Sequence, residues 1–550
     1  MSASFASLPT APDLILHNAR IYTVDEARPW IEAVAIRKHR ISAVGSNEDV
    51  LALAVDNATR IIDGKGRLVL PGLCDAHIHF YDWSIGLAEV QLADTTSKAE
   101  MLDLIAARAA ETPPGQWIVG RGWNESRWGE TAFPTAAELD AVTGDRPGLF
   151  SRSDMHGAVA NSAALRAAGV DDNTPNPPGG LIERDAAGHA TGVLKELAIG
   201  LVGRQIPNPS GATLDEAILA GQARLHQLGV TAIHDQRMKD EDDGPQARAA
   251  YQRLLARKQL KLRVNSNVAA HEIGCLTELG LHSGFGNDYL RLGHVKFFSD
   301  GSMGSRTARL LAPFEKLAED EDDNLGIFIT DPEDLAAGMT QAARLGWPVS
   351  VHAIGDGANR LVMDVFAEIQ VTLPPPRVPH RIEHVQIVDP ADLPRMNEIG
   401  LTASVQPIHV TDDMDTADIL LGERGATMYN FRTLLDSGAH LALGSDAPVS
   451  DPNPFLGMHA ALTRQRHARM ARGPWYGDER ITMAEIVYGY TLGAAEAVGW
   501  ADRIGSITPG KRADLIMLDR DLFALAEAGV SGDEIATTQV VLTIFDGEEV

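Results

Sequence analysis

Hydrophobic residues recur in short runs along the chain, and their pattern near the two ends differs from that in the middle. Between residues 14 and 70 they alternate with polar residues in the segments LILHNARIYTV, AVAIRKHRISAVG and TRIIDGKGRLVL, which is typical of β-strands with one exposed face. The segments IGSITPGKRADLIMLDRD and QVVLTIFDGEEV near the other end have the same pattern. We therefore expect one small β domain that both ends of the chain build together.

The middle of the chain has short, continuously apolar runs that alternate with longer stretches of helical character. Such runs are typical of parallel strands that are buried on both faces. Eight of them with helices between predict an α/β fold, a (β/α)8 TIM barrel, whose active-site groups lie at the carboxyl ends of the strands. The predicted strands lie within residues 68–80, 230–235, 261–268, 293–300, 348–356, 380–386, 401–407 and 441–447.

One interval is too long for the repeat of such a barrel. Between His79 and Val230 the chain runs for about 150 residues, and loops of that length without structure of their own are not found in compact domains. We therefore expect an inserted subdomain at about residues 85–225, after the first barrel strand. The expected organisation is a composite β-sandwich from residues 1–70 and 506–550 and a barrel at residues 71–505.

The net charge of −27 bears on the expected partners. Acidic runs such as EDEDD at residues 319–323 create a field that repels nucleic acid and anionic membrane surfaces. No uncharged apolar stretch reaches the roughly 18 residues that span a bilayer. The N-terminal segment lacks the basic start and apolar run of a signal peptide, and two cysteines make no disulfide framework. We expect a cytoplasmic protein that acts on a small molecule, without nucleic-acid or membrane partners.

Two histidines end the first predicted barrel strand. In LVLPGLCDAHIHF, His77 and His79 are separated by one residue, so their side chains point to the same face of the strand. Two imidazoles so placed are able to share one metal ion. Two hydrogen-bonded core histidines are the alternative for this motif taken alone.

Further polar residues stand at the ends of other predicted strands. His352, His384 and Asp446 each follow strongly apolar residues, and burying any of them without a partner is costly. A lone histidine in such a place is usually a hydrogen-bonded core residue. Because all of these groups lie at one end of the predicted barrel, together they favour a metal centre. We do not expect His234, at the end of a second strand, to be a ligand.

Lys296, within the fourth predicted strand, is a further candidate for this set of residues. A lysine that points into a barrel loses hydration, which lowers its pKa and leaves part of the amine neutral. A neutral amine can add CO2 and become a carbamate, an anionic ligand with two oxygens. Pairing of Lys296 with Asp300 or another carboxylate is the alternative, and the spacing alone slightly favours that pair.

A set of motifs is spread in order along essentially the whole chain: PGLCDAHIHF, VKFFSDGSMGSRTA, VSVHAIGDGA, RIEHVQ, LGSDAPV and GSITPGKRADLIMLD. The insertion adds DMHGAVANSAAL and GRGWNESRW. Together these motifs resemble the amidohydrolase superfamily of metal-dependent hydrolases, and within it the amidohydrolase 3 branch, the YtcJ-like proteins.

The resemblance implies a (β/α)8 barrel with a composite β-sandwich and a centre of two divalent metal ions, usually zinc. It also implies that Lys296 is carboxylated and that its carbamate bridges the two ions. Superfamily members are often dimers or tetramers, so we expect a homodimer. The implied ligands are His77, His79 and Asp446 for the more buried ion and His352 and His384 for the second.

The expected reaction is hydrolysis of a C–N amide-type bond in an N-acyl or N-formyl amide of a small molecule. Two ions about 3.5–4 Å apart can share a hydroxide that attacks the carbonyl carbon. Asp446 would bind metal, take the proton of the water and deliver it to the leaving nitrogen. Ring opening of a cyclic amide, deamination and ester cleavage on the same centre are alternatives. A barrel that only binds a ligand is another, and the complete set of ligands argues against it.

Five residues are candidates for substrate contact, each with a structural alternative. His156 and His409 either contact the substrate or hold a loop in place. Trp123 and Trp128 either form an apolar wall over the pocket or pack in the core of the inserted subdomain. Arg306 either meets a substrate carboxylate or forms a structural ion pair.

Overall fold

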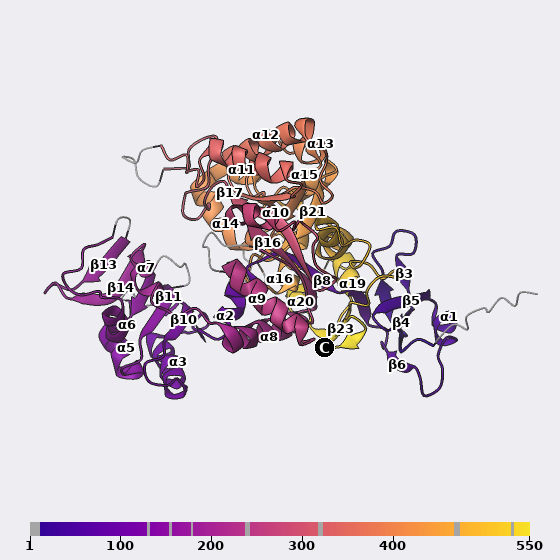
Figure 1. Ribbon diagram of the computed structural model, residues 1–550, viewed down its shortest axis with the longest axis horizontal. Helices are drawn as coiled ribbons and strands as arrows, with labels where there is room; N and C mark the ends of the chain where they lie inside the picture. Colours follow the sequence, from indigo (N-terminus) through magenta and orange to yellow (C-terminus); the bar gives the residue numbers. More distant parts are fainter. Residues whose placement is uncertain are drawn as a thin grey trace, which may run out of the picture. The chain divides into compact units, whose positions relative to one another are not determined.

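The computed structural model describes residues 11–128, 133–152, 157–177, 180–236, 243–316, 323–466, 473–529 and 533–550. The chain divides into two compact units. One contains Met1–Trp83 and Leu219–Val550, and the other, Ser84–Ile218, interrupts it. In Figure 1 the indigo N-terminal strands lie beside the yellow C-terminal segment, so the first unit is built from both ends of the chain.

Within the described residues, eight parallel strands form the barrel sheet of the first unit, each paired with its neighbours in chain order. All six residues of Leu73–Ile78 and of Val230–Asp235 are buried, as expected of strands with helices outside and side chains inside. The predicted α/β barrel is confirmed. The strands are β8 (Leu73–Ile78), β15 (Val230–Asp235), β16 (Arg263–Ala269), β17 (Leu290–Phe298), β18 (Val349–Ala353), β19 (Arg381–His384), β20 (Thr402–Val405) and β21 (His440–Leu443).

Helices follow the barrel strands and bury one face each. On α12, for example, Val362, Phe366 and Ile369 are buried at spacings of four and three residues. The helices lying wholly or partly in this unit are α1 (Asn47–Leu51), α2 (Phe80–Gly86), α8 (Gly211–Gln227), α9 (Asp243–Ala256), α10 (Ile273–Glu278), α11 (Pro332–Arg344), α12 (Asp356–Thr372), α13 (Arg395–Ile399), α14 (Pro407–Leu421), α15 (Phe431–Asp436), α16 (Pro454–Thr463), α17 (Met483–Tyr488), α18 (Ala494–Ala497), α19 (Leu522–Glu527) and α20 (Asp533–Ala536).

The loop after β21 closes the seam between the last and first barrel strands. The backbone nitrogen of Asp446 donates to the carbonyl of His77 at 2.7 Å, and that of His79 donates to the carbonyl of Ala447 at 2.8 Å. Asp75 on β8 adds a side-chain clamp, since it accepts hydrogen bonds from the backbone nitrogen and the hydroxyl of Ser445. The seam therefore places Asp446 directly beside the two histidines of β8.

Two sheets in the described residues form the β-sandwich. Segments from both ends of the chain pair in it, with Leu70 opposite Ile516, and its core includes Ile36, Val69 and Ile544. The composite sandwich is confirmed. One sheet has the order β5 (Arg40–Gly45), β4 (Ala33–Arg37), β1 (Leu14–His17) and β6 (Arg60–Asp63), and the other β24 (Glu548–Glu549), β23 (Val540–Phe545), β22 (Leu515–Leu518), β7 (Leu68–Pro71), β2 (Arg20–Tyr22) and β3 (Trp30–Ile31).

The first barrel strand was predicted within residues 68–80, but the apolar run at Leu68–Pro71 is strand β7 of the sandwich. The barrel strand is therefore only β8. Strand β7 pairs with β2 and β22, whereas the barrel strand starts at Leu73. Gly72 lies at the change of sheet, where a Cβ would be 2.3 Å from Oγ1 of Thr231 on β15. Only glycine fits so close an approach.

The inserted unit, Ser84–Ile218, has its own sheet and its own core and occupies the interval expected to hold a subdomain. Trp123, Leu139 and Phe150 lie in that core. Its sheet has the order β13 (Gly180–Arg184), β14 (Ala190–Glu196), β12 (Gly157–Ala160), β11 (Gly148–Arg152), β10 (Ile118–Trp123) and β9 (Val90–Gln91), and its helices are α3 (Lys98–Glu111), α4 (Glu125–Trp128), α5 (Ala136–Thr143), α6 (Ser162–Ala167) and α7 (Ile199–Gly203).

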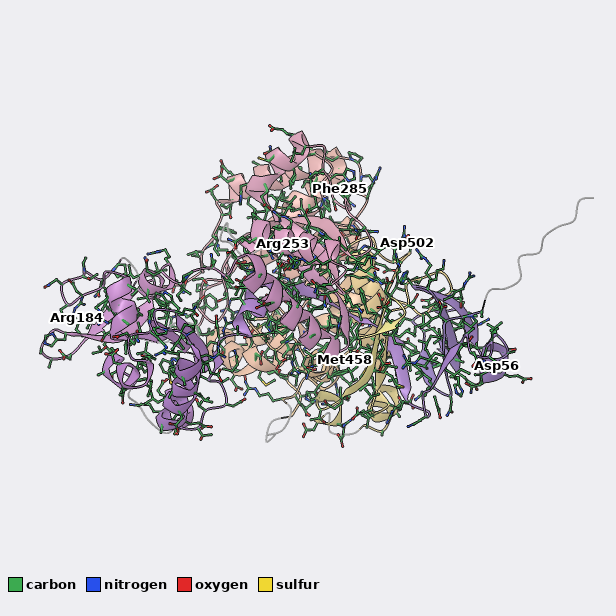
Figure 2. All side chains as sticks on the ribbon, turned by 60° about the horizontal axis from the view of Figure 1, so that its bottom comes forward. Asp56, Arg184, Arg253, Phe285, Met458 and Asp502 are labelled. Carbon is green, nitrogen blue, oxygen red and sulfur yellow. The ribbon has the colours of Figure 1, made fainter. Side chains whose placement is uncertain are left out.

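The outer surface carries many side chains that reach into solvent. Figure 2 shows them on the ribbon, among them the exposed Asp56 of the sandwich. In the part of the chain that the structure describes, none of the helices combines the length and the apolar character needed to cross a membrane.

Candidate metal centre

Three of the predicted ligands converge where β8 meets the loop after β21. Oδ1 of Asp446 lies 3.3 Å from Nε2 of His77 and 3.2 Å from Nε2 of His79. The three side chains are buried, and one ligand atom from each lies within 4.8 Å of the others. Asp446 follows His77 by 369 positions and His79 by 367 positions in the sequence, yet one ion could contact all three side chains.

The hydrogen bonds of His77 leave a lone pair that faces Asp446. Nδ1 of His77 lies 2.7 Å from Oε2 of Glu383, and an ionised carboxylate only accepts, so this nitrogen donates. Nε2 then carries the lone pair. Within the described residues neither Nε2 of His77 nor Oδ1 of Asp446 has a hydrogen-bond partner. Two buried lone pairs facing each other repel unless a cation lies between them, so the residues present fit a divalent metal ion.

Glu383 is held in place by a second buried charge. Arg381, two residues earlier on β19, donates from Nε to Oε1 at 2.5 Å and from Nη2 to Oε2 at 2.8 Å. Burial works against ionisation of Glu383, but Arg381 and His77 hold its pKa well below the usual range. Sequence reasoning missed this pair. Its signal was the motif RIEH, which places two opposite charges in a strand otherwise suited to burial.

Two of the predicted ligands have left-handed backbone conformations. The φ angle is +76° at His384 and +63° at Asp446, and such values cost about 1–3 kcal/mol each in residues other than glycine. In a straight strand His384 would point away from its neighbour Glu383. Its ring instead lies at centroid distances of 4.8 Å from His77 and 4.5 Å from His352. The strained backbone thus turns His384 towards the other histidines.

His352 and His384 are each anchored through one ring nitrogen. Nε2 of His352 lies 3.0 Å from the carbonyl oxygen of Gly301, and Nδ1 of His384 lies 2.9 Å from Oε1 of Gln406. Both acceptors are amide oxygens, so both ring nitrogens donate. The lone pair is therefore on Nδ1 of His352 and on Nε2 of His384, and each histidine has a nitrogen available to a metal.

Lys296 lies in the same buried region, and the carboxylate partner that was its alternative role is not found among the described residues. Within the described residues no carboxylate oxygen lies within 4.0 Å of its Nζ, which is 5.1 Å from the centre of the Phe298 ring. Burial lowers the pKa of Lys296 to about 8, against the opposing effect of Glu383 and Asp446. Asp300, the alternative partner, accepts backbone hydrogen bonds from Ile354 and Gly355 instead. The salt bridge between Lys296 and Asp300 is not formed.

His409 reaches the centre from α14, whereas His234 does not. Nε2 of His409 lies 4.0 Å from Oδ2 of Asp446, and these two residues and His384 have ligand atoms within 4.8 Å of one another. Nδ1 of His234 accepts a hydrogen bond from Nη1 of Arg381 at 2.9 Å. That hydrogen bond uses the lone pair that a metal would need.

The two tryptophan candidates belong to the core of the inserted unit. Trp123 has no exposed surface, and its Nε1 donates to the carbonyl of Phe150 at 2.8 Å. Trp128 stacks against it at a centroid distance of 6.0 Å and donates to the carbonyl of Thr95. The prediction of substrate contact is therefore wrong for Trp123, because its whole side chain is used in packing. Trp123 instead packs in the core of the inserted unit, which was the alternative to substrate contact.

Substrate contact by Arg306 and by His156 remains a prediction. Arg306 lies in the loop after β17, with its guanidinium carbon 5.9 Å from the centre of the Phe314 ring. His156 lies outside the described residues.

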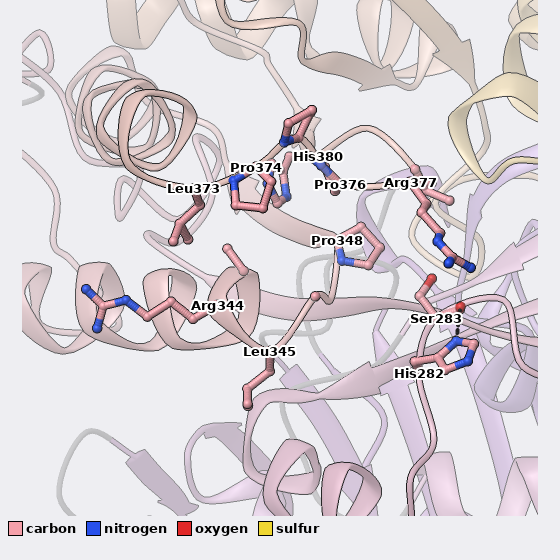
Figure 3. A pocket seen from close by; sticks show the side chains of 14 residues that line it. His282, Ser283, Arg344, Leu345, Pro348, Leu373, Pro374, Pro376, Arg377 and His380 are labelled. Atoms are coloured by element: carbon pink, nitrogen blue, oxygen red, sulfur yellow. Dashed lines mark hydrogen bonds between the residues drawn. The ribbon is translucent and has the colours of Figure 1, made fainter.

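A cavity of about 360 Å³ lies at the opposite end of the barrel. Pro348 and His380, which precede β18 and β19, line it together with residues 373–378 (Figure 3). Active sites of such barrels form at the carboxyl ends of the strands, and this cavity is at the amino ends. It is therefore separate from the metal centre.

Gly444→Ala is expected to open the seam beside the centre. A Cβ at this position would lie 2.5 Å from the backbone nitrogen of His77 and 2.7 Å from Oδ1 of Asp75. The strands must then shift, at a cost of about 1–3 kcal/mol, which urea unfolding measures. Gly274→Ala on α10 is the control, because nothing lies within 4 Å of its added Cβ. Equal stability of the two variants would contradict the clash.

Several known proteins are similar to this chain over most of its length. A family model described as "Amidohydrolase family" matches residues 60–550. The putative amidohydrolase YtcJ of Bacillus subtilis is 31% identical over 529 residues, covering 96% of this chain and 98% of that protein. The N-substituted formamide deformylase of Arthrobacter pascens is 28% identical over 552 residues, covering 97% of each. A crystal structure of an uncharacterized metal-dependent hydrolase from Pyrococcus furiosus is 28% identical with a TM-score of 0.75, covering 93% of this chain and 99% of that one.

Proposed function

The chain belongs to the amidohydrolase family, and on that premise we propose that it hydrolyses the C–N bond in an N-acyl or N-formyl amide of a small molecule. The similarity to an N-substituted formamide deformylase along nearly the whole chain supports this substrate class. The acidic net charge supports a small-molecule substrate over nucleic acid.

The observation that carries the proposal is the pair of buried lone pairs at His77 and Asp446, which face each other without partners among the described residues. Imidazole nitrogen and carboxylate oxygen are ligands that zinc prefers, so we propose zinc as the metal. His352 and His384 would hold a second ion through the nitrogens that their hydrogen bonds leave free.

Asp446 is the residue proposed to move the proton. A divalent ion held by His77, His79 and Asp446 would supply Lewis acidity and would lower the pKa of a bound water towards about 7. The carboxylate accepts a proton from the attacking water as the C–O bond forms, and it gives that proton to the leaving nitrogen as the C–N bond breaks.

Lys296 is proposed to carry a carbamate, formed when its neutral amine adds to the carbon of CO2 and loses one proton. After metal removal by a chelator, we expect zinc with bicarbonate to restore activity and zinc alone to restore little. The neutral fraction of an amine with a pKa of about 8 rises with pH. At a fixed concentration of dissolved CO2, reconstitution should therefore be faster at about pH 9 than at about pH 6. Equal recovery without bicarbonate would contradict the carbamate.

A substrate panel tests the reaction itself. N-formyl amides, N-acyl amides, lactams and aminated heterocycles are incubated with the zinc-loaded enzyme, and release of amine, acid and ammonia is measured. We expect equal amounts of amine and acid from the open-chain amides. Turnover of lactams alone, or release of ammonia from the heterocycles alone, would replace the proposal by a cyclic amidase or a deaminase.

A further inference from the structure

Three histidines of the centre share one hydrogen-bonding pattern, and His409 differs from them. In His77, His352 and His384 one ring nitrogen donates to an oxygen, which leaves the other nitrogen with a lone pair. In His409 the neighbour is a donor, because Nδ1 lies 3.2 Å from the amide nitrogen Nε2 of Gln386. Nδ1 of His409 must therefore accept, and in the neutral ring the proton resides on Nε2.

This proton points into the centre, where the described residues offer it no acceptor. His409 is 5% exposed, and its Nε2 has no hydrogen-bond partner among the described residues. Oδ2 of Asp446 lies 4.0 Å from this nitrogen. That distance is too long for a hydrogen bond. An N–H directed towards a carboxylate is attracted, whereas a lone pair in the same place would be repelled.

The position of Gln386 is set by the backbone around it. Gln386 follows β19 directly, and its carbonyl accepts from the backbone nitrogen of Tyr429 at 2.8 Å. The imidazole of His409 lies nearly parallel to that of His384, with an interplanar angle of 13° and a centroid distance of 6.4 Å. The ring is thus held on two sides, by the amide of Gln386 and by the neighbouring imidazole.

We propose that His409 is a catalytic hydrogen-bond donor and not a metal ligand: its Nε2–H binds the carbonyl oxygen of the substrate, and Gln386 is the positioning residue that selects this tautomer. The inference rests on the proposed function, since it needs a carbonyl substrate. Negative charge grows on that oxygen when water adds to the carbonyl carbon, so a donor already in place stabilises the transition state. The alternative role for His409 is metal ligation. It is suggested only by proximity, because His384, His409 and Asp446 have ligand atoms within 4.8 Å of one another.

His409→Leu and His409→Gln separate the two roles. Loss of one preorganised donor typically lowers kcat by about 10²–10³-fold, so we expect a fall of that size in His409→Leu, with zinc stoichiometry unchanged and the zinc Kd within about twofold. Glutamine retains an N–H donor, and His409→Gln should recover part of the lost kcat. Zinc Kd is measured by competition with a chromogenic chelator, and thermal unfolding checks that each variant is folded. A large loss of zinc affinity in both variants would overturn the proposal in favour of ligation.

The tautomer is measured independently of activity. In metal-free protein labelled with ¹⁵N-histidine, two-bond ¹H–¹⁵N spectra distinguish Nδ1–H from Nε2–H, and His409→Leu identifies the signal. We expect Nε2–H in the wild type and a mixture in Gln386→Met, which should also lower kcat with little change in KM. An Nδ1–H tautomer in the wild type would overturn the proposal. If the wild type turns over no amide, the proposed function fails, and this spectrum with the zinc titration still decides between donor and ligand.

Discussion

Asp446→Asn is expected to lower kcat by about 10²–10⁴-fold, the range for loss of a general acid–base group. The amide of asparagine neither takes the proton of the attacking water nor returns it to the leaving nitrogen. The loss of negative charge also removes the anionic oxygen that lies within 3.3 Å of both His77 and His79. Steady-state kinetics on an amide substrate, with the zinc content of the same sample, measures the effect.

Asp392→Asn is the matched control for Asp446→Asn. Asp392 is also a carboxylate with little exposure, but it pairs with Arg360 and Arg395. We expect its kcat to equal that of the wild type. If Asp446→Asn keeps wild-type turnover with zinc bound, the proton-transfer role is wrong. If it loses zinc entirely, the result shows ligation, and activity at saturating zinc must then separate the two roles.

Glu383→Ala is expected to cost about 3–5 kcal/mol of stability, as does removal of one partner from a buried ion pair. Arg381 and Glu383 have no exposed surface, so the variant leaves an uncompensated guanidinium inside the barrel. It also removes the acceptor that orients His77, and loss of such a partner typically weakens metal binding by about 10–100-fold. Urea unfolding of the metal-free protein and zinc competition measure the two effects separately.

The double variant Arg381→Met with Glu383→Met tests whether these two effects have separate causes. Well-packed apolar residues often replace a buried ion pair without loss of stability, so the double variant should regain most of the stability lost in Glu383→Ala. Its zinc affinity should stay low, because Nδ1 of His77 still lacks its acceptor. Recovery of zinc affinity together with stability would show that Glu383 acts only as the counter-ion of Arg381.

The local pattern of apolar and polar residues was enough to predict the buried strands. Side chains alternate along a strand and repeat every three to four residues along a helix, so the chain's own order of apolar and polar residues indicates which segments are buried strands. That is why Val230–Asp235 is observed at its predicted bounds, and why His77 and His79 were expected to point the same way. Both features depend on neighbours within a few residues.

Other features depend on residues far apart in the sequence, and local pattern left them open. Trp123 is a candidate for a pocket wall by its sequence, but in the structure it belongs to the same buried core as Leu139 and Phe150. For Lys296, spacing alone slightly favours a pair with Asp300 or another carboxylate, but the backbone nitrogens of Ile354 and Gly355 already donate to Asp300. In both cases the deciding partners come from other elements of the fold.

The sequence by itself determined the barrel, the composite sandwich, the presence of an insertion and the residue types of a metal centre, because these follow from periodicity and from motifs read along the chain. Only the tertiary structure decided which ring nitrogen of His77, His384 and His409 is hydrogen-bonded. That choice depends on single acceptors or donors brought in from other elements: Glu383 for His77, Gln406 for His384 and Gln386 for His409. A hydrogen bond of about 3 Å is set by the packing of whole strands, and no spacing of residues along one strand specifies it.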